Sequence, residues 1–252
     1  MNNDEQRRIF REQLLSPVVR EYPYKDQLLC GFMALEGAEY AANRKLMVVG
    51  RAVNGWRDSA CVSNLVTDEQ KDSFIDSIFW SDQECKLAWV EAGAGSHNDY
   101  NTNRSAFWRV IKAVSRSLGV WGEDNDWAWS SGLVWSNLYK ISPHAGGNPS
   151  DRLCALQEEG CIRLLRQELI DYAPERVLFL TGMPWAWNFM KGLGCRLQAT
   201  QGVVEAHGLI GLPEARLSIP FVVASHPQGK CESSWVEAVL EAFQTQRPDT
   251  DW

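Results

Sequence analysis

Polar residues and glycines follow four short apolar runs of the sequence. Their side chains can hydrogen-bond a ligand, and the glycines let the backbone approach it. Gly50–Trp56 follow the first run, Asn137 lies near the end of the second, Thr181 and Gly182 follow the third, and Ser225–Lys230 follow the fourth. In open α/β sheets, ligands bind beyond the carboxyl ends of the strands. We therefore expect these residues to form one composite site.

His226 precedes Pro227, which places it on a rigid turn at the rim of the expected sheet. A neutral imidazole there can donate a hydrogen bond to charge that develops on a leaving group. Asn54 lies in a glycine-flanked loop, where the backbone can approach a ligand closely and an amide can hold a water. The structural alternatives are a packing histidine and a turn asparagine in the left-handed conformation.

Asn137 lies within an otherwise apolar run. A buried amide has to be hydrogen-bonded, so it either joins core groups or reads the edge of a flat polar ligand such as a base. Arg104 and Lys230 can meet phosphates, although single surface cations are also explained by solvation alone. Lysine and arginine number 25 against 32 acidic residues, a net charge of −7, which argues against tight nonspecific binding of phosphates.

Several other kinds of site are excluded by their missing motifs. The sequence has no phosphate-binding loop, no dinucleotide-binding glycine pattern and no serine nucleophile elbow. The histidines lack the close spacing of metal ligands, and the cysteines include no Cys-x-x-Cys pair. We therefore expect no cofactor, no metal and no metal cluster.

The elements that must position these residues are predicted from the apolar pattern. Runs of strand length, buried on both faces, are 46–49, 133–138, 176–180 and 221–224. Amphipathic stretches predict helices at 5–19, 27–42, 107–118, 153–172, 185–191 and 235–243, and residues 202–209 predict a further strand or hairpin. Capping boxes are expected at Thr67–Gln70 and Ser234–Glu237.

This order predicts an α/β fold of three layers, α/β/α, around a short, mostly parallel four-stranded sheet. No linker separates domains, so residues 1–252 are expected to form a single domain with an N-terminal helical extension over about residues 1–44. The N-terminus has no signal-like apolar region, and no run approaches the roughly 18 apolar residues that span a bilayer. We expect a cytoplasmic protein with no membrane partner.

Four motifs, in this order, resemble the uracil-DNA glycosylase superfamily, whose members share a short parallel sheet between helices. Leu46–Gly50 and the following loop resemble its first motif, and Asn103–Lys112 resemble the helix start of the mismatch-specific branch. Leu133–Leu138 resemble the strand that ends in a base-reading asparagine, and Ser225–Pro227 resemble the His-Pro-Ser motif. Together they span about Leu46 to Lys230.

The resemblance implies a monofunctional DNA glycosylase, which flips a base from duplex DNA and hydrolyses its N-glycosidic bond to leave an abasic site. Asn54 would position the water, and His226 would stabilise the departing base anion. The substrate-binding residues would be Gly50, Arg51, Ala52 and Asn137, with Trp56 or Tyr100 stacking on the base. The residues that contact double-stranded DNA would be Arg104, Lys140, Gln228 and Lys230.

Ala52 stands where the uracil-specific branch carries a water-activating aspartate, and Ala52 and Gly55 are small where relatives carry a bulky tyrosine. The resemblance thus implies room at pyrimidine C5, and a modified pyrimidine as substrate. Bacterial defence proteins that resemble this superfamily attack hypermodified cytosines in phage DNA, so an antiviral role is expected. The alternatives are a hydrolase of small nucleotides or nucleosides and a catalytically inactive base-binding module.

Overall fold

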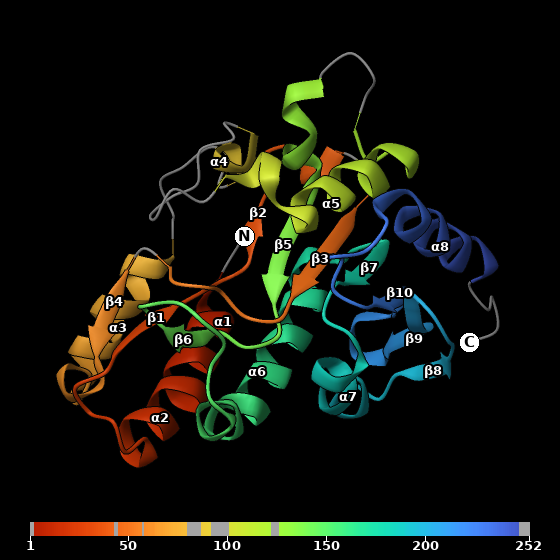
Figure 1. Ribbon diagram of the computed structural model, residues 1–252. Helices are drawn as coiled ribbons and strands as arrows, with labels where there is room; N and C mark the ends of the chain where they lie inside the picture. The colour runs from red at the N-terminus through yellow and green to blue at the C-terminus, as the bar shows by residue number, and fades with distance from the viewer. Residues whose placement is uncertain are drawn as a thin grey trace. The chain divides into compact units, whose positions relative to one another are not determined.

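The computed structural model describes residues 3–42, 45–56, 58–79, 87–91, 101–121 and 126–246 (Figure 1). The chain forms two compact units, each built from three segments. The first unit takes Met1–Ala34, Arg51–Gln83 and Asn137–Asp171, and the second takes Leu35–Gly50, Glu84–Ser136 and Tyr172–Trp252.

The second unit is built on a seven-stranded sheet. In spatial order its strands are β2 (Leu35–Glu36), β5 (Leu133–Asn137), β3 (Leu46–Gly50), β7 (Arg176–Phe179), β10 (Leu217–Ala224), β9 (Val204–Leu212) and β8 (Arg196–Ala199). Both β3 and β10 pair with β7 in parallel, whereas the β2–β5, β10–β9 and β9–β8 pairs are antiparallel.

The α/β class is confirmed, and the four predicted strands correspond to β3, β5, β7 and β10, which lie side by side. The prediction of four strands is wrong, because β2 extends one edge of the sheet and β9 and β8 extend the other. Strand β9 confirms the further strand predicted over residues 202–209. Gly208 permits the β8–β9 pairing: a Cβ at this position would lie 2.0 Å from the carbonyl oxygen of Arg196.

The second unit also contains helical segments. They are η2 (Tyr40–Ala42), α4 (Ala88–Glu91), η4 (Thr102–Arg104), α5 (Ala106–Ser117), η5 (Asp126–Gly132), α7 (Met183–Gly192), η6 (Pro213–Ala215) and α8 (Glu232–Thr245). Helix α8 packs on α5, β9 and β10, with Trp235 fully buried at the contact. The capping box predicted at Ser234 is wrong, because α8 begins at Glu232 and Cys231 is its N-cap.

The first unit has a small antiparallel sheet, with β1 (Leu28–Gly31) between β4 (Ser59–Cys61) and β6 (Ile141–Pro143). Its helices are α1 (Asp4–Ile9), η1 (Phe10–Leu15), α2 (Ser16–Glu21), η3 (Val62–Asn64), α3 (Asp68–Ile78) and α6 (Asp151–Tyr172). The capping box predicted at Thr67 and Gln70 is confirmed at the start of α3. No helix in the described ranges is long and apolar enough to cross a membrane.

The N-terminal extension is helical only in its first half, so the helix predicted over 27–42 is wrong. That stretch contains β1, β2 and η2 instead. Its apolar residues form an almost continuous run, and such a run suits a strand buried on both faces as well as a helix. Pairing with β4 and β6 settles β1 as a strand.

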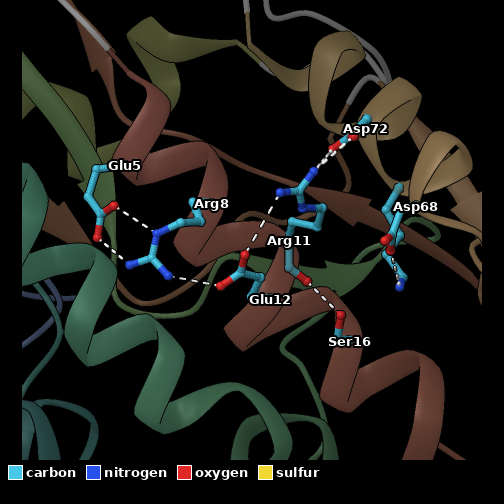
Figure 2. Close-up of polar contacts among 8 residues, drawn as sticks. Glu5, Arg8, Arg11, Glu12, Ser16, Asp68 and Asp72 are labelled. Atoms are coloured by element: carbon cyan, nitrogen blue, oxygen red, sulfur yellow. Dashed lines mark hydrogen bonds and ion pairs between the residues drawn. The ribbon is translucent and has the colours of Figure 1, made fainter.

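Ion pairs join the N-terminal helical segment to α3 (Figure 2). Arg11 contacts Asp72 at 3.0 Å, and Arg7 pairs with Asp76. Arg8 is bound within its own segment, by Glu5 and Glu12. Exposed ion pairs stabilise a fold only weakly, so the burial of Phe10 and Leu14 supplies more of the stability.

Lys140 lies in the interior of the first unit, so the prediction that it contacts DNA is wrong. Its Nζ is 2.6 Å from Glu168 Oε1 on α6, and both side chains are fully buried. The ammonium also lies 5.9 Å from the ring centroid of Phe32. Gln157 Oε1 accepts the backbone N–H groups of Lys140 and Ile141. The segment after Asn137 is therefore held to α6 by buried polar contacts.

We expect Lys140→Met to lower the free energy of unfolding by roughly 3–5 kcal/mol, because Glu168 would stay buried without its ammonium partner. Replacing both residues, Lys140→Met with Glu168→Leu, should recover most of this loss. Urea denaturation measures both. Arg163→Met is the matched control, because it breaks an exposed ion pair with Glu159 on the same helix and should cost at most about 1 kcal/mol. Wild-type stability of the single Lys140 variant would contradict the buried pair.

Candidate functional site

In the second unit, the carboxyl ends of β3, β7 and β10 lie at one edge of the sheet, because these strands are parallel. Hydrogen bonds continue past the strand ends: Leu180 N–H donates to the carbonyl of Val49, and Gly182 N–H donates to the carbonyl of Ala224. The residues predicted to follow β7 and β10 are therefore brought together at this edge.

His226, just past β10, is half-buried and stacks on Phe107 of α5, with ring centroids 6.2 Å apart and planes inclined by 21°. Its Nδ1 lies 3.3 Å from the backbone nitrogen of Gln228, whose N–H donates to it. A nitrogen that accepts carries no hydrogen, so in the neutral ring the hydrogen is on Nε2. His226 is thus arranged to donate from Nε2, as the role predicted for it requires.

The residue before His226 is held by Trp235, whose Nε1 donates to the carbonyl of Ser225 at 2.9 Å. Beyond it, Gln228 and Lys230 are exposed, as is Arg104 in η4. These three side chains can reach a ligand from solvent, and their contact with DNA stays a prediction. Arg109, by contrast, forms a bidentate contact with Glu232, which raises the pKa of the guanidinium.

In the first unit, the loop that follows β3 carries Asn54 at the surface. Asn54 Oδ1 accepts the backbone N–H of Gly147 at 2.5 Å, so the amide oxygen joins two loops. A water-holding role would therefore fall to its amide nitrogen. Arg51 and Ala52, earlier in the loop, are half-buried, and Gly50 is the buried last residue of β3.

Trp56 does not present an open face to a base. Its side chain is only 6% exposed and meets Phe32 edge to face, with ring centroids 5.4 Å apart and planes at 80°. The prediction that Trp56 stacks on a base is thus corrected: the indole is part of the core of the first unit. Tyr100, the other stacking residue predicted, lies outside the described residues.

Asn137 is the last residue of β5 and is only 2% exposed. Its Nδ2 is buried and has no hydrogen-bond partner among the described residues. An unsatisfied buried donor costs about 1–3 kcal/mol. No core contact within the described residues therefore accounts for this nitrogen.

Backbone and side-chain hydrogen bonds hold the Asn54 loop to the segment that follows Asn137. Tyr139 N–H donates to the carbonyl of Arg51 at 2.9 Å, and His144 Nδ1 lies 3.0 Å from the carbonyl oxygen of Trp56. This contact of His144 was not predicted from the sequence. The pair of glycines shortly after it, Gly146 and Gly147, is the signal for a tight loop that was available in the sequence.

The second unit also holds a pocket of roughly 300 Å³. It is lined by Val90, Glu91, Thr102, Asn103, Trp108, Arg109, Lys112 and Trp129. Glu91 accepts hydrogen bonds from the backbone and hydroxyl of Ser130 at 2.8 and 2.6 Å, and burial raises the pKa of its carboxyl. Among the described residues, no group of three histidine, cysteine or acidic side chains is placed to hold a metal ion.

Comparison with known proteins does not assign the chain to a family. No protein-family model matches the sequence, and no curated protein matches it. The resemblance to glycosylases therefore depends on the four motifs and on the residues described above.

Cys231, exposed at the N-cap of α8, is predicted to be the most reactive cysteine in the described part of the chain. Contacts from the hydroxyls of Ser233 and Ser234 lower the pKa of its thiol to about 7. The thiolate fraction rises with pH through the pKa, so alkylation by iodoacetamide should reach half its maximal rate near this pH. A Ser233→Ala, Ser234→Ala double variant should move the midpoint upward. A wild-type midpoint at or above the ordinary thiol pKa of about 8.5 would contradict the geometry.

Proposed function

We propose that the chain is a monofunctional DNA glycosylase, which hydrolyses the N-glycosidic bond of a flipped, modified pyrimidine in double-stranded DNA. The observation that carries this proposal is the buried amide of Asn137, whose Nδ2 has no partner within the described residues. A donor left in this state at the end of a strand of an α/β sheet is explained by a ligand that binds there.

An asparagine amide suits the edge of a pyrimidine. A cytosine-type edge presents the N3 acceptor beside the N4 amino donor, so one carboxamide can donate to the first and accept from the second. Enzymes that act on flipped bases read the base by such edge hydrogen bonds. A base-reading role for Asn137 therefore accounts for a donor that no described residue satisfies.

His226 supplies the second requirement of glycosidic cleavage. When the bond between C1′ and the base nitrogen breaks, the electron pair leaves with the base, which becomes an anion. A hydrogen bond from a fixed donor stabilises such developing charge. The Nε2–H of His226 suits this role, because the Gln228 contact fixes the tautomer and Phe107 supports the ring plane.

Water, rather than a lysine, is proposed as the nucleophile. Lys140, three residues after Asn137, has its ammonium buried in the pair with Glu168, which favours hydrolysis without strand cleavage. The proposed DNA contacts are Arg104, Gln228 and Lys230, all exposed. We propose hypermodified cytosine of phage DNA as the substrate, and the cytoplasm as the place where the two meet. The reason is that Ala52 is small where the uracil-DNA glycosylase superfamily carries a bulky tyrosine.

The test is a glycosylase assay on duplexes that contain uracil, a mismatch or a hypermodified cytosine, with alkali-labile sites as the readout. We expect abasic sites in the modified duplex only with the wild type. Asn137→Asp, which removes the amide donor, should lose about 10- to 100-fold in rate, the size expected when a buried polar group loses its ligand partner. Asn188→Asp makes the same change at an exposed position of α7 and should keep full activity.

The contrary outcomes are distinct. Turnover of free nucleotides but not of duplex DNA would identify a small-molecule hydrolase. Binding of modified DNA without turnover, and unaffected by Asn54→Ala or His226→Ala, would identify an inactive base-binding module. Strong activity on plain uracil with none on the modified duplex would overturn the proposed substrate.

A further inference from the structure

His144 has the opposite hydrogen-bonding arrangement from His226. Its Nδ1 lies 3.0 Å from the carbonyl oxygen of Trp56, and a carbonyl oxygen only accepts. Nδ1 therefore carries the hydrogen, which leaves Nε2 of the neutral ring as an acceptor with a free lone pair. The side chain is half-buried, so solvent reaches the residue.

The backbone around His144 contacts the Asn54 loop closely. His144 N–H donates to the carbonyl of Leu28 on β1 at 3.0 Å. A Cβ on Gly55 would lie 2.9 Å from the carbonyl oxygen of His144, and one on Gly146 would lie 3.1 Å from Asn54 Oδ1. Both glycines have positive φ, 71° and 96°, so only glycine fits this approach without strain. The imidazole and the Asn54 amide are thereby held on two loops that touch.

The hydrolysis requires a base that this chain does not supply at the expected position. Ala52 stands where the resembling enzymes carry a carboxylate, and an asparagine amide cannot take up a proton. The titratable groups on the elements around His144 include Cys30 on β1 and Arg51 and Asp58 in the Asn54 loop. Burial raises the pKa of the Cys30 thiol, which donates to the carbonyl of Ser142, and Arg51 stays protonated. Asp58 is thus the rival base.

We propose that His144 is the general base of the hydrolysis, an inference that rests on the proposed glycosylase function. Nε2 takes a proton from a water held by the amide nitrogen of Asn54, as the water oxygen forms a bond to C1′. The C1′–N bond breaks, and its electron pair leaves with the base. The imidazolium then returns its proton to solvent, and the histidine is restored.

His144→Asn separates this role from a structural one. An asparagine amide nitrogen takes about the place of Nδ1 and keeps the bond to the Trp56 carbonyl, whereas the ionisable Nε2 is removed. General acid–base catalysis contributes about 10²–10⁴-fold, so kcat on the modified duplex should fall by at least about 100-fold. The affinity for modified DNA should stay unchanged.

The pH profile of kcat provides the readout that a structural role would not move. A protonated Nε2 cannot accept, so the wild-type rate should fall on the acidic side, and this fall should be absent from the residual rate of His144→Asn. Added imidazole should partly restore His144→Ala, which keeps the inference testable if the asparagine variant is unstable. Thermal melting of each variant reports on folding.

Three results would overturn the inference. Wild-type kcat and pH profile in His144→Asn would leave the histidine a structural role only. Loss of the acidic limb in Asp58→Asn, but not in His144→Asn, would make Asp58 the base. An inactive wild type on every duplex would refute the proposed function itself, whereas an active wild type with a normal His144→Asn refutes this inference alone.

Discussion

Parallel pairing of β3 and β10 with β7 is the constraint on which the placement of the candidate residues depends. The pairing aligns Met47, Val177 and Phe221 at one level of the sheet. Residues from three distant parts of the sequence therefore emerge at the same edge. The same pairing buries both faces of these strands, so each reads as a continuous apolar run until the chain reaches the polar residues beyond it. The polar residues at the carboxyl ends of the strands and the apolar residues within the strands therefore both follow from the parallel topology.

Within each unit, hydrogen-bond partners decide what a histidine can do. His226 accepts from a backbone N–H and is left with a donor at Nε2, whereas His144 faces a carbonyl and is left with an acceptor. The same side chain thus suits stabilisation of an anion in one case and removal of a proton in the other. In both cases the partner atom alone fixes the tautomer.

Prediction from sequence was most accurate for elements whose structure depends on neighbouring residues or on a pattern repeated along the chain. The four buried strands and the Thr67 capping box are such cases, since the apolar runs and the T-x-x-Q spacing carry the information. Lys140 and Trp56 were misjudged because their partners, Glu168 and Phe32, are distant in sequence, and an isolated basic or aromatic residue resembles a surface one. The edge strands β2 and β8 were missed because short strands with partly exposed side chains have little apolar pattern. Asn137 could be named as a candidate from sequence, but only the structure reveals that its amide nitrogen has no hydrogen-bond partner among the described residues.

The central claim is that a base is removed by water while the DNA strand stays whole. Intact-mass spectrometry of a defined duplex with one hypermodified cytosine tests it most directly. We expect the modified strand to lose its base and gain a hydroxyl at C1′, the free base to appear in solution, and borohydride to trap no covalent protein–DNA adduct. An unchanged strand mass would contradict glycosylase action, and a trapped adduct would contradict water as the nucleophile.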